Sequence, residues 1–570
     1  MSSAVPALEE AGRVGALADD GTRRRDSIAL FVGLTLAYIL LRSPSYIGDA
    51  MRWLPLEVAP EFPSDASGAR HYFFVWFAWL VYHAGAALGL VNEASPLRTS
   101  AIAIVQGVNA ILSAGAVVVM YRFLRLSASR RAALTGVAFV ACSSAYVLHS
   151  TNATEPVPSL VPALLGLYLV ARTPERRSTR LLAAVLQGVA TSFYLVSSVF
   201  TLPTAWFAFT RGAGTSGSVP LAKRVRVAAE HLVPAGLIYG TLVFVSELLI
   251  HPERGVAVAA HQPVNFELYG IYGGFQLRSL IGAFFGFANS LYPFPANQGM
   301  SRLFHLPPRS MATILAVSAL GISFLGLLVW RLFGARQRLL ANGRWVEATA
   351  GALWFLAVYG VAFYFLAGYD KTWLFAAFPV ALLVSVVVDD ALAFSSEGQA
   401  ERTERRGVAR LWFLVPGLLL LAANVGLVVI PRRLARNLDL EAALAVAERV
   451  KPHDLVVCRG WDNPSGYMRY VLKRPVDNVA LADDSLRLGR STERFTNHLE
   501  SKVASTKAQG GRLYFLGVLD DSPDTWALFF AKDLNIPYEL FEPYRRGAKQ
   551  LDDPKLEEAG VKLFEFPLGR

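Results

Sequence analysis

The chain has 570 residues, of which 54% are hydrophobic and only 17% charged, and its mean hydropathy is +0.38. Soluble domains carry about 25% charged residues, so this composition excludes an ordinary soluble protein and indicates a polytopic helical membrane protein. The net charge of +11 does not indicate nucleic-acid binding, because the basic residues cluster between apolar runs, as helix orientation in a membrane requires. Two cysteines support neither a disulfide framework nor a cysteine metal site.

The N-terminal residues 1–26 are polar and lack the short apolar region of a cleaved signal peptide, which predicts a cytosolic tail. The first apolar segment covers residues 27–41 and follows three consecutive arginines. By the positive-inside rule these arginines stay in the cytosol, so Asp49 is expected just beyond the outer face. An acid at that depth is costly unless it is solvated or paired, and it needs a topological or functional reason.

Further apolar runs bring the predicted number of membrane spans to eleven. After the first span they cover residues 98–121, 132–148, 158–171, 181–195, 196–210, 227–250, 311–333, 346–367, 372–395 and 411–430. Basic clusters follow alternate spans, near residues 122–131, 176–180, 223–226, 336–338 and 402–406. The short loops 149–158 and 367–373 hold only one basic residue besides histidine, Lys371. This alternation assigns the clusters to the cytosol and exports the C-terminal segment.

Two segments between spans are longer than the topology needs, at residues 42–97 and 251–310. The first contains an apolar, aromatic stretch at residues 73–90. If this stretch crossed the membrane, every later basic cluster would change sides, so we expect an interfacial or re-entrant helix. Together the two segments are expected to cover a site at the outer boundary between water and lipid.

The sequence changes character after the last span, and we expect three regions: a tail at 1–26, a transmembrane catalytic region at 27–431 and an extracytoplasmic domain at 432–570. Short buried strands are predicted at 454–458, 478–483, 512–518 and 561–566, with helical stretches between them. Such alternation predicts a small α/β domain with a mostly parallel sheet. No glycine-rich phosphate-binding motif follows these strands, so nucleotide binding is not indicated.

Several ionisable residues fall on the predicted outer side. The candidates are Asp49, Arg52, His71, His149, Glu155, Arg278 and Lys371. A carboxylate there is able to take a proton from an acceptor hydroxyl, and cationic side chains are able to hold a phosphate leaving group. These are the groups that sugar transfer from a lipid phosphate needs.

Each candidate also has a simpler explanation. Asp49 is equally explained as the cap of a juxtamembrane helix, and the two histidines as ordinary interfacial residues. Lys371, next to Asp370, is explained by an exposed tight loop. Arg278 is harder to explain in this way, because an arginine in an apolar helix must reach the interface or find an anion.

The layout resembles the GT-C glycosyltransferases, integral membrane enzymes that take a sugar from a polyprenyl-phosphate or dolichyl-phosphate carrier. The resemblance rests on "YIGDAMRW" directly after the first span, on the aromatic segment at 70–90, on residues 143–172 and on "YDKTWLFAAFPVALLVS". The C-terminal segment from Val450 to Asp484 is similar to the soluble domain of the bacterial branch, which includes mannosyl- and aminoarabinose-type transferases.

The resemblance implies that Asp49 is the catalytic base and that Arg52 belongs to the same motif. Many relatives carry a second acid directly behind the first, whereas positions 50 and 51 are Ala and Met here. The requirement for a divalent cation is therefore left open, and no cofactor is assigned. Glu155 is then the candidate supporting acid. Arg278 and Lys371, with Arg52, His71 and His149, are candidates for contacts to the substrate or its phosphate.

The implied activity is transfer of one sugar, with inversion, from a polyprenyl-phosphate donor to a lipid, glycan or protein acceptor outside a bacterial or archaeal plasma membrane. The main alternative is a transporter or flippase for a lipid-linked or anionic substrate. Transporters usually place ionisable residues near the bilayer midplane in two related halves, and the sequence shows neither feature. A scaffold with an exported partner-binding domain is a third hypothesis.

Overall fold

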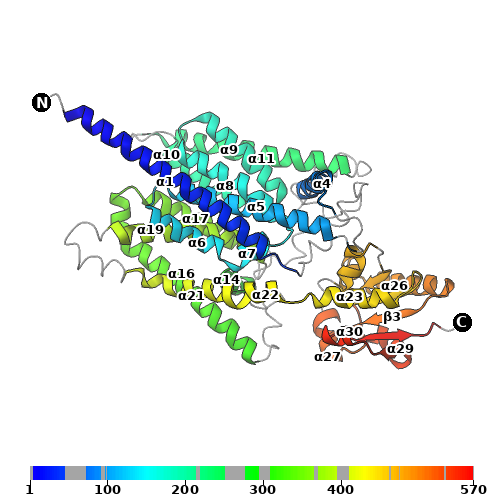
Figure 1. The fold of residues 1–570 in the computed structure, drawn as a ribbon. Coiled ribbons are helices and arrows are strands. Elements are labelled where there is room, and N and C mark those ends of the chain that lie inside the picture. The colour runs from blue at the N-terminus through cyan, green and yellow to red at the C-terminus, as the bar shows by residue number, and fades with distance from the viewer. Residues whose placement is uncertain are drawn as a thin grey trace. The chain divides into compact units, whose positions relative to one another are not determined.

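The computed structural model describes residues 4–44, 72–91, 97, 99–212, 219–250, 277–293, 308–364, 370–393, 410–460, 464–473, 476–531 and 534–568 (Figure 1). Contacts divide the chain into two units. The first consists of Met1–Arg42, Ser67–Phe77 and Gln106–Arg433, and the second of Ser43–Ala66, Ala78–Val105 and Leu434–Arg570. Each unit is described by itself.

The first unit is helical, and a helix covers at least part of every range where the sequence predicts a span. Its main helices are α1 (Ala4–Leu40), α5 (Thr99–Leu124), α6 (Arg130–Ala141), α7 (Ser144–Ser150), α8 (Pro156–Arg172), α9 (Arg177–Phe193), α10 (Thr201–Arg211), α11 (Leu221–Ile250), α14 (Leu277–Leu291), α16 (Pro308–Ala341), α17 (Trp345–Tyr364), α19 (Ala377–Ala393), α21 (Val415–Asn424) and α22 (Ile430–Leu434). In a bilayer, helices satisfy their backbone groups internally, which is why long apolar runs become helices.

Six helices in the described part of the chain are long and apolar enough to cross a membrane, or seven if α6 and α7 form one broken span bent by 67°. The predicted count of eleven is therefore not confirmed. The difference arises where apolar runs are short or interrupted. Helix α8 has 17 residues and α10 has 11, and a 3-10 turn, Leu195–Phe200, lies between α9 and α10.

Helix α19 belongs to the segment Lys371–Leu392, which is almost entirely buried inside the first unit. It packs against α6, α16 and α17. Phe378 of α19 stacks on Trp354 at 6.2 Å and contacts Phe200 at 5.5 Å. Offset aromatic pairs of this kind add to the stabilisation from burial itself.

Gly136 allows α6 and α19 to approach each other closely. A β-carbon at this position would lie 2.6 Å from the backbone oxygen of Ala381. Small residues at helix crossings allow such contact in membrane proteins.

We expect Gly136→Ala to destabilise the protein by about 1–3 kcal/mol, because overpacking shifts the backbone. Thermal unfolding in detergent measures this effect. The matched control is Gly326→Ala on α16, where a β-carbon meets nothing within 4 Å. Equal stability of the two variants would contradict the close helix contact.

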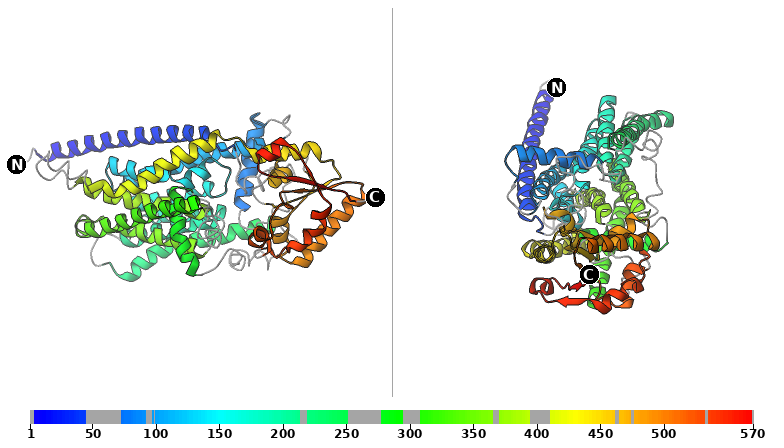
Figure 2. Two further views of the ribbon diagram at one scale, coloured as in Figure 1. Left: turned by 90° about the horizontal axis from the view of Figure 1, so that it is seen from below. Right: turned by 90° about the vertical axis from the view of Figure 1, so that its right-hand side faces the viewer.

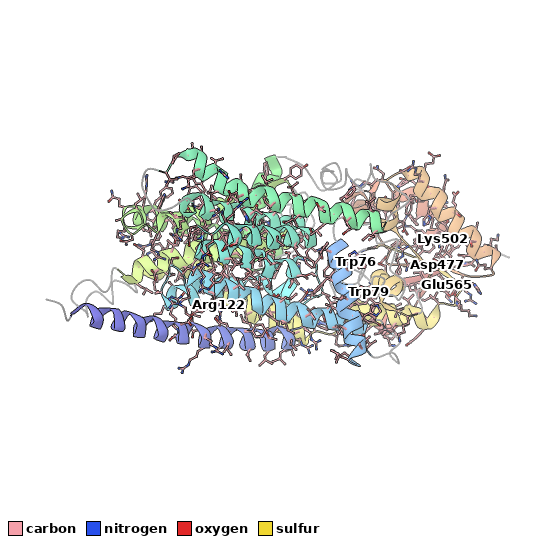
Figure 3. The ribbon with its side chains drawn as sticks, turned by 90° about the horizontal axis from the view of Figure 1, so that it is seen from above. Trp76, Trp79, Arg122, Asp477, Lys502 and Glu565 are labelled. Carbon is pink, nitrogen blue, oxygen red and sulfur yellow. The ribbon has the colours of Figure 1, made fainter. Side chains whose placement is uncertain are left out.

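Two helices fall inside the segments that the sequence assigns to long outer loops. Helix α4 (Tyr72–Ala87) has 16 residues, and Figure 3 shows Trp76 and Trp79 on it. It is shorter than the roughly 20 residues that a span needs, and its interfacial placement stays a prediction. Helix α14 packs against α16 and α17, and its Phe287 contacts Phe355 at 5.4 Å.

The second unit contains a five-stranded sheet in the order β2-β1-β3-β5-β4. The strands are β1 (Leu455–Cys458), β2 (Asn478–Ala480), β3 (Leu513–Leu516), β4 (Lys549–Leu551) and β5 (Leu563–Phe566). Strands β2 and β3 pair in parallel with β1, but β5 pairs antiparallel with both β3 and β4. Two of the four strand pairings are therefore antiparallel, and the prediction of a mostly parallel sheet is wrong. Strand β4 was missed because it has only three residues, largely exposed.

Helices of the same unit, coloured yellow to red in Figure 2, include α23 (Leu438–Arg449) and α26 (Thr492–Ala508). Trp526 is fully buried among aromatic side chains and donates its indole N–H to the Ile536 carbonyl at 2.8 Å. Lys502 of α26 pairs with Asp477 at 3.0 Å (Figure 3). The unit therefore has an apolar core of its own.

Candidate functional site

The candidate site in the first unit centres on a buried ion pair between Glu155 and Lys371. The ammonium of Lys371 donates to Glu155 Oε1, although the two residues are 216 positions apart. The residues are only 3% and 4% exposed, respectively. Removing two charges from water costs free energy. A buried ion pair is therefore expected to have a defined geometry or to serve another role.

Local structure explains how each partner reaches this position. Glu155 precedes Pro156, which occupies the first turn of α8, where proline costs no hydrogen bond. Lys371 belongs to the short helix α18 (Asp370–Trp373). Trp373 anchors this helix, because it is fully buried and contacts Phe287 and Tyr359, each at 6.2 Å.

The segment between α7 and α8 is held by polar contacts. Asn109 of α5 is fully buried, and its amide donates to the carbonyl oxygens of Asn152 at 2.9 Å and Thr154 at 3.1 Å. His149, also fully buried, lies with Nδ1 3.2 Å from the hydroxyl of Thr154. These bonds fix the backbone that leads directly into Glu155.

Several buried polar atoms around this segment have no hydrogen-bond partner among the described residues. They are Asn109 Oδ1, Asn152 Oδ1 and Ser150 Oγ. Leaving a buried polar group without a partner costs about 1–3 kcal/mol, so such atoms normally contact water or a ligand. The site therefore combines a fixed pair of charges with hydrogen-bonding groups that are available to a polar ligand.

The arrangement is suited to an anionic, hydroxyl-rich ligand. A lysine ammonium has three donors, so Lys371 is able to hold Glu155 and a phosphate oxygen together. A charge-assisted hydrogen bond of this kind is about twice as strong as a neutral one. The amide and hydroxyl oxygens supply acceptors for sugar hydroxyl groups.

The structure brings together some of the residues that the sequence predicts and leaves others outside the described part of the chain. It pairs Glu155 with Lys371 and places His149 on the segment leading to Glu155. Asp49, Arg52 and His71 lie outside the described residues, as does the side chain of Arg278. Sequence reasoning missed Asn109, whose one signal is an amide side chain within the apolar run at 99–124.

The described residues contain no group of three or more His, Cys, Asp or Glu side chains placed to hold a metal ion. Glu155 is the acid that the sequence proposes here, and its Oε1 already accepts from Lys371. Within the described ranges, a divalent cation would thus lack a preformed set of ligands.

No protein-family model and no curated protein matches the sequence. Among solved structures, the chain matches the archaeal oligosaccharyltransferase AglB from Archaeoglobus fulgidus, in complex with an inhibitory peptide and a dolichol-phosphate. The TM-score is 0.52 at 13% identity, over 93% of this chain and 73% of that chain. Such a match concerns the fold alone.

Two further solved structures are similar at lower scores. A second structure of the A. fulgidus oligosaccharyltransferase, in complex with Zn and sulfate, has a TM-score of 0.48 at 13% identity, over 92% of this chain and 72% of that one. ArnT from Cupriavidus metallidurans, bound to undecaprenyl phosphate, has a TM-score of 0.44 at 12% identity, over 94% of this chain and 97% of that one.

Proposed function

Because the chain has the fold of the GT-C membrane glycosyltransferases, we propose that it transfers a sugar from a polyprenyl-phosphate donor to a lipid, glycan or protein acceptor. The observation that carries the proposal is the likeness to the oligosaccharyltransferase over 93% of this chain. Fold by itself does not fix activity, so the site must supply the chemistry. The solved structure of the oligosaccharyltransferase contains a dolichol-phosphate, which supports a lipid-linked donor.

In the proposed reaction, the carboxylate of Asp49 takes the proton of the acceptor hydroxyl while that oxygen attacks the anomeric carbon. The bond from this carbon to the donor phosphate breaks, and its electron pair leaves with the polyprenyl phosphate. A base in this role contributes about 10²- to 10⁴-fold to the rate. Direct displacement of this kind inverts the anomeric centre.

Lys371 is proposed to stabilise the charge that develops on the leaving phosphate, together with Arg278 and Arg52. Fixed cationic donors act strongly in a site from which water is excluded. Glu155 is proposed to keep Lys371 charged and oriented, since an unpaired buried lysine favours its neutral form. His71 and His149 are proposed to contact the sugar or phosphate.

The proposed side of reaction is extracytoplasmic, with the N-terminus in the cytosol and the residue 432–570 domain exported. The alternation of basic clusters along the sequence supports this orientation. In this proposal, a lipid-linked sugar reaches the pair of Glu155 and Lys371 from within the bilayer.

One observation favours the transport hypothesis, namely the break between α6 and α7, which are bent by 67°. Discontinuous helices form substrate sites in many transporters. The break precedes the segment that carries His149 and Glu155, and a glycosyltransferase uses such a break equally well to place a loop at a site.

The test is sugar transfer by the purified chain in lipid nanodiscs, with a panel of radiolabelled polyprenyl-phosphate sugars. We expect transfer to a lipid or peptide acceptor, or slow hydrolysis of one donor. Activity before and after chelation shows whether a divalent cation takes part. If no donor is turned over and a fluorescent lipid-linked sugar crosses vesicles that contain the protein, the transport hypothesis replaces this one.

A further inference from the structure

The second unit contains a cavity where its parallel strands end. Strand β1 lies between β2 and β3. After β1 the chain forms β2 on one side of β1, and it then crosses to the other side to form β3. In open α/β sheets, ligands bind beyond the carboxyl ends of the strands at such a change of direction. The sheet thus places a crevice beyond Cys458 and Leu516, the last residues of β1 and β3.

The cavity has a volume of about 40 Å³ and is lined by Arg459, Ser465, Gly517, Asp520 and Gly560, among others. Gly517 and Gly560 have φ angles of +62° and +69°. Only glycine adopts this backbone conformation easily, and its missing side chain keeps the space open. The volume accommodates one or two water-sized groups and is far too small for a whole sugar ring.

The polar groups at the cavity are only partly satisfied. Ser465 is 3% exposed, and its hydroxyl has no hydrogen-bond partner in the described ranges. Arg459 donates to the Gly517 carbonyl and pairs with Asp521. At the cavity, the buried hydroxyl of Ser465 is therefore available for a hydrogen bond with a ligand or water.

The charges around the cavity balance. Among the lining residues, Arg459 supplies one positive charge and Asp520 supplies one negative charge. An anion would meet the carboxylate of Asp520, and a cation would meet the guanidinium group of Arg459. A neutral group that both donates and accepts hydrogen bonds avoids the electrostatic cost of either contact.

We propose that this cavity binds the hydroxymethyl group or an adjacent pair of hydroxyls of a neutral sugar, with the sugar ring remaining at its mouth. The site lies in the second unit and belongs to different residues from the pair of Glu155 and Lys371. The inference extends the proposed function by a second saccharide-binding site. Its test measures binding alone, so it succeeds or fails independently of sugar transfer.

The experiment is saturation-transfer NMR on the full chain in lipid nanodiscs, without detergents that carry sugar head groups. The probes are methyl α-D-mannopyranoside and methyl α-D-glucopyranoside, with inorganic phosphate as competitor. We expect saturation transfer strongest at the hydroxymethyl protons of at least one sugar, unchanged by phosphate. Ser465→Val, which removes the hydroxyl and fills the cavity, is expected to weaken binding at least tenfold.

Two control variants locate the signal. Ser485 is fully buried in the same unit, and its hydroxyl donates to the Leu534 carbonyl away from the cavity. Ser485→Ala is expected to lower the unfolding temperature without weakening sugar binding. The double variant Glu155→Gln with Lys371→Met, which removes both charges of the other site, is expected to leave the signal intact. If Ser465→Val does not fold, Ser465→Ala takes its place, with a smaller loss of binding.

The proposal is overturned if neither sugar gives a signal, if the signal persists in the Ser465 variant, or if phosphate displaces it. Loss of the signal in the folded double variant Glu155→Gln with Lys371→Met also overturns it, because the sugar would then bind in the helical unit. Failure of the proposed enzymatic function has a different signature, which is the absence of turnover of every lipid-linked donor.

Discussion

Asp49→Asn is expected to lower kcat/KM for sugar transfer by about 10²- to 10⁴-fold, with donor affinity nearly unchanged. Asparagine has a similar shape but cannot take a proton, so the substitution removes the base and little else. The loss should appear in kcat, because the base acts only in the transition state. Transfer of a radiolabelled sugar in nanodiscs, with donor binding measured in parallel, separates the two effects.

The matched control for this variant is Asp65→Asn, which removes a carboxylate from the same segment between the first two predicted spans. It is expected to retain activity within about threefold of wild type, because Asp65 lies outside the YIGDAMRW motif. Equal activity of Asp49→Asn and wild type would contradict the catalytic role of the YIGDAMRW motif. A loss of donor binding that accounts for the whole effect would assign Asp49 to binding.

The second large effect concerns the buried pair. Lys371→Met removes the ammonium that pairs with Glu155, a residue that is only 3% exposed. Breaking a buried pair by removing one partner typically costs 3–5 kcal/mol, because the remaining charge is uncompensated. We therefore expect Lys371→Met to lower the free energy of unfolding by about 3–5 kcal/mol and to abolish transfer.

A double variant separates the structural role of the pair from its catalytic role. Lys371→Met combined with Glu155→Gln removes both charges, and we expect it to recover most of the lost stability but none of the activity. Lys555→Met is the control, since Lys555 is 54% exposed in its pair with Glu448 and should contribute less than about 1 kcal/mol. Recovery of activity in the double variant would show that Lys371 does not contact the donor phosphate.

The sequence by itself determined the class of protein and the positions of most helices, because apolar runs and basic clusters are local properties of the chain. It also determined four of the five strands of the C-terminal sheet. The fold that the resemblance implies agrees with the fold of the oligosaccharyltransferase, which the chain matches over 93% of its length. The sequence did not determine the number of spans, since apolar runs such as Pro156–Arg172 and Thr201–Arg211 form helices of only 17 and 11 residues.

Only the tertiary structure decided which residues meet. Glu155 and Lys371 were predicted separately, as a supporting acid and a phosphate contact, and the fold joins them across 216 positions. Asn109 carries no pattern of its own, and its role depends on two carbonyl groups of another segment. Likewise, the sequence of β5 predicts an ordinary buried strand, and its antiparallel direction depends on the path of the chain between β3 and β5. Hydropathy is a property of each residue and its neighbours in the sequence, whereas the pairing of side chains and strands depends on packing between distant segments.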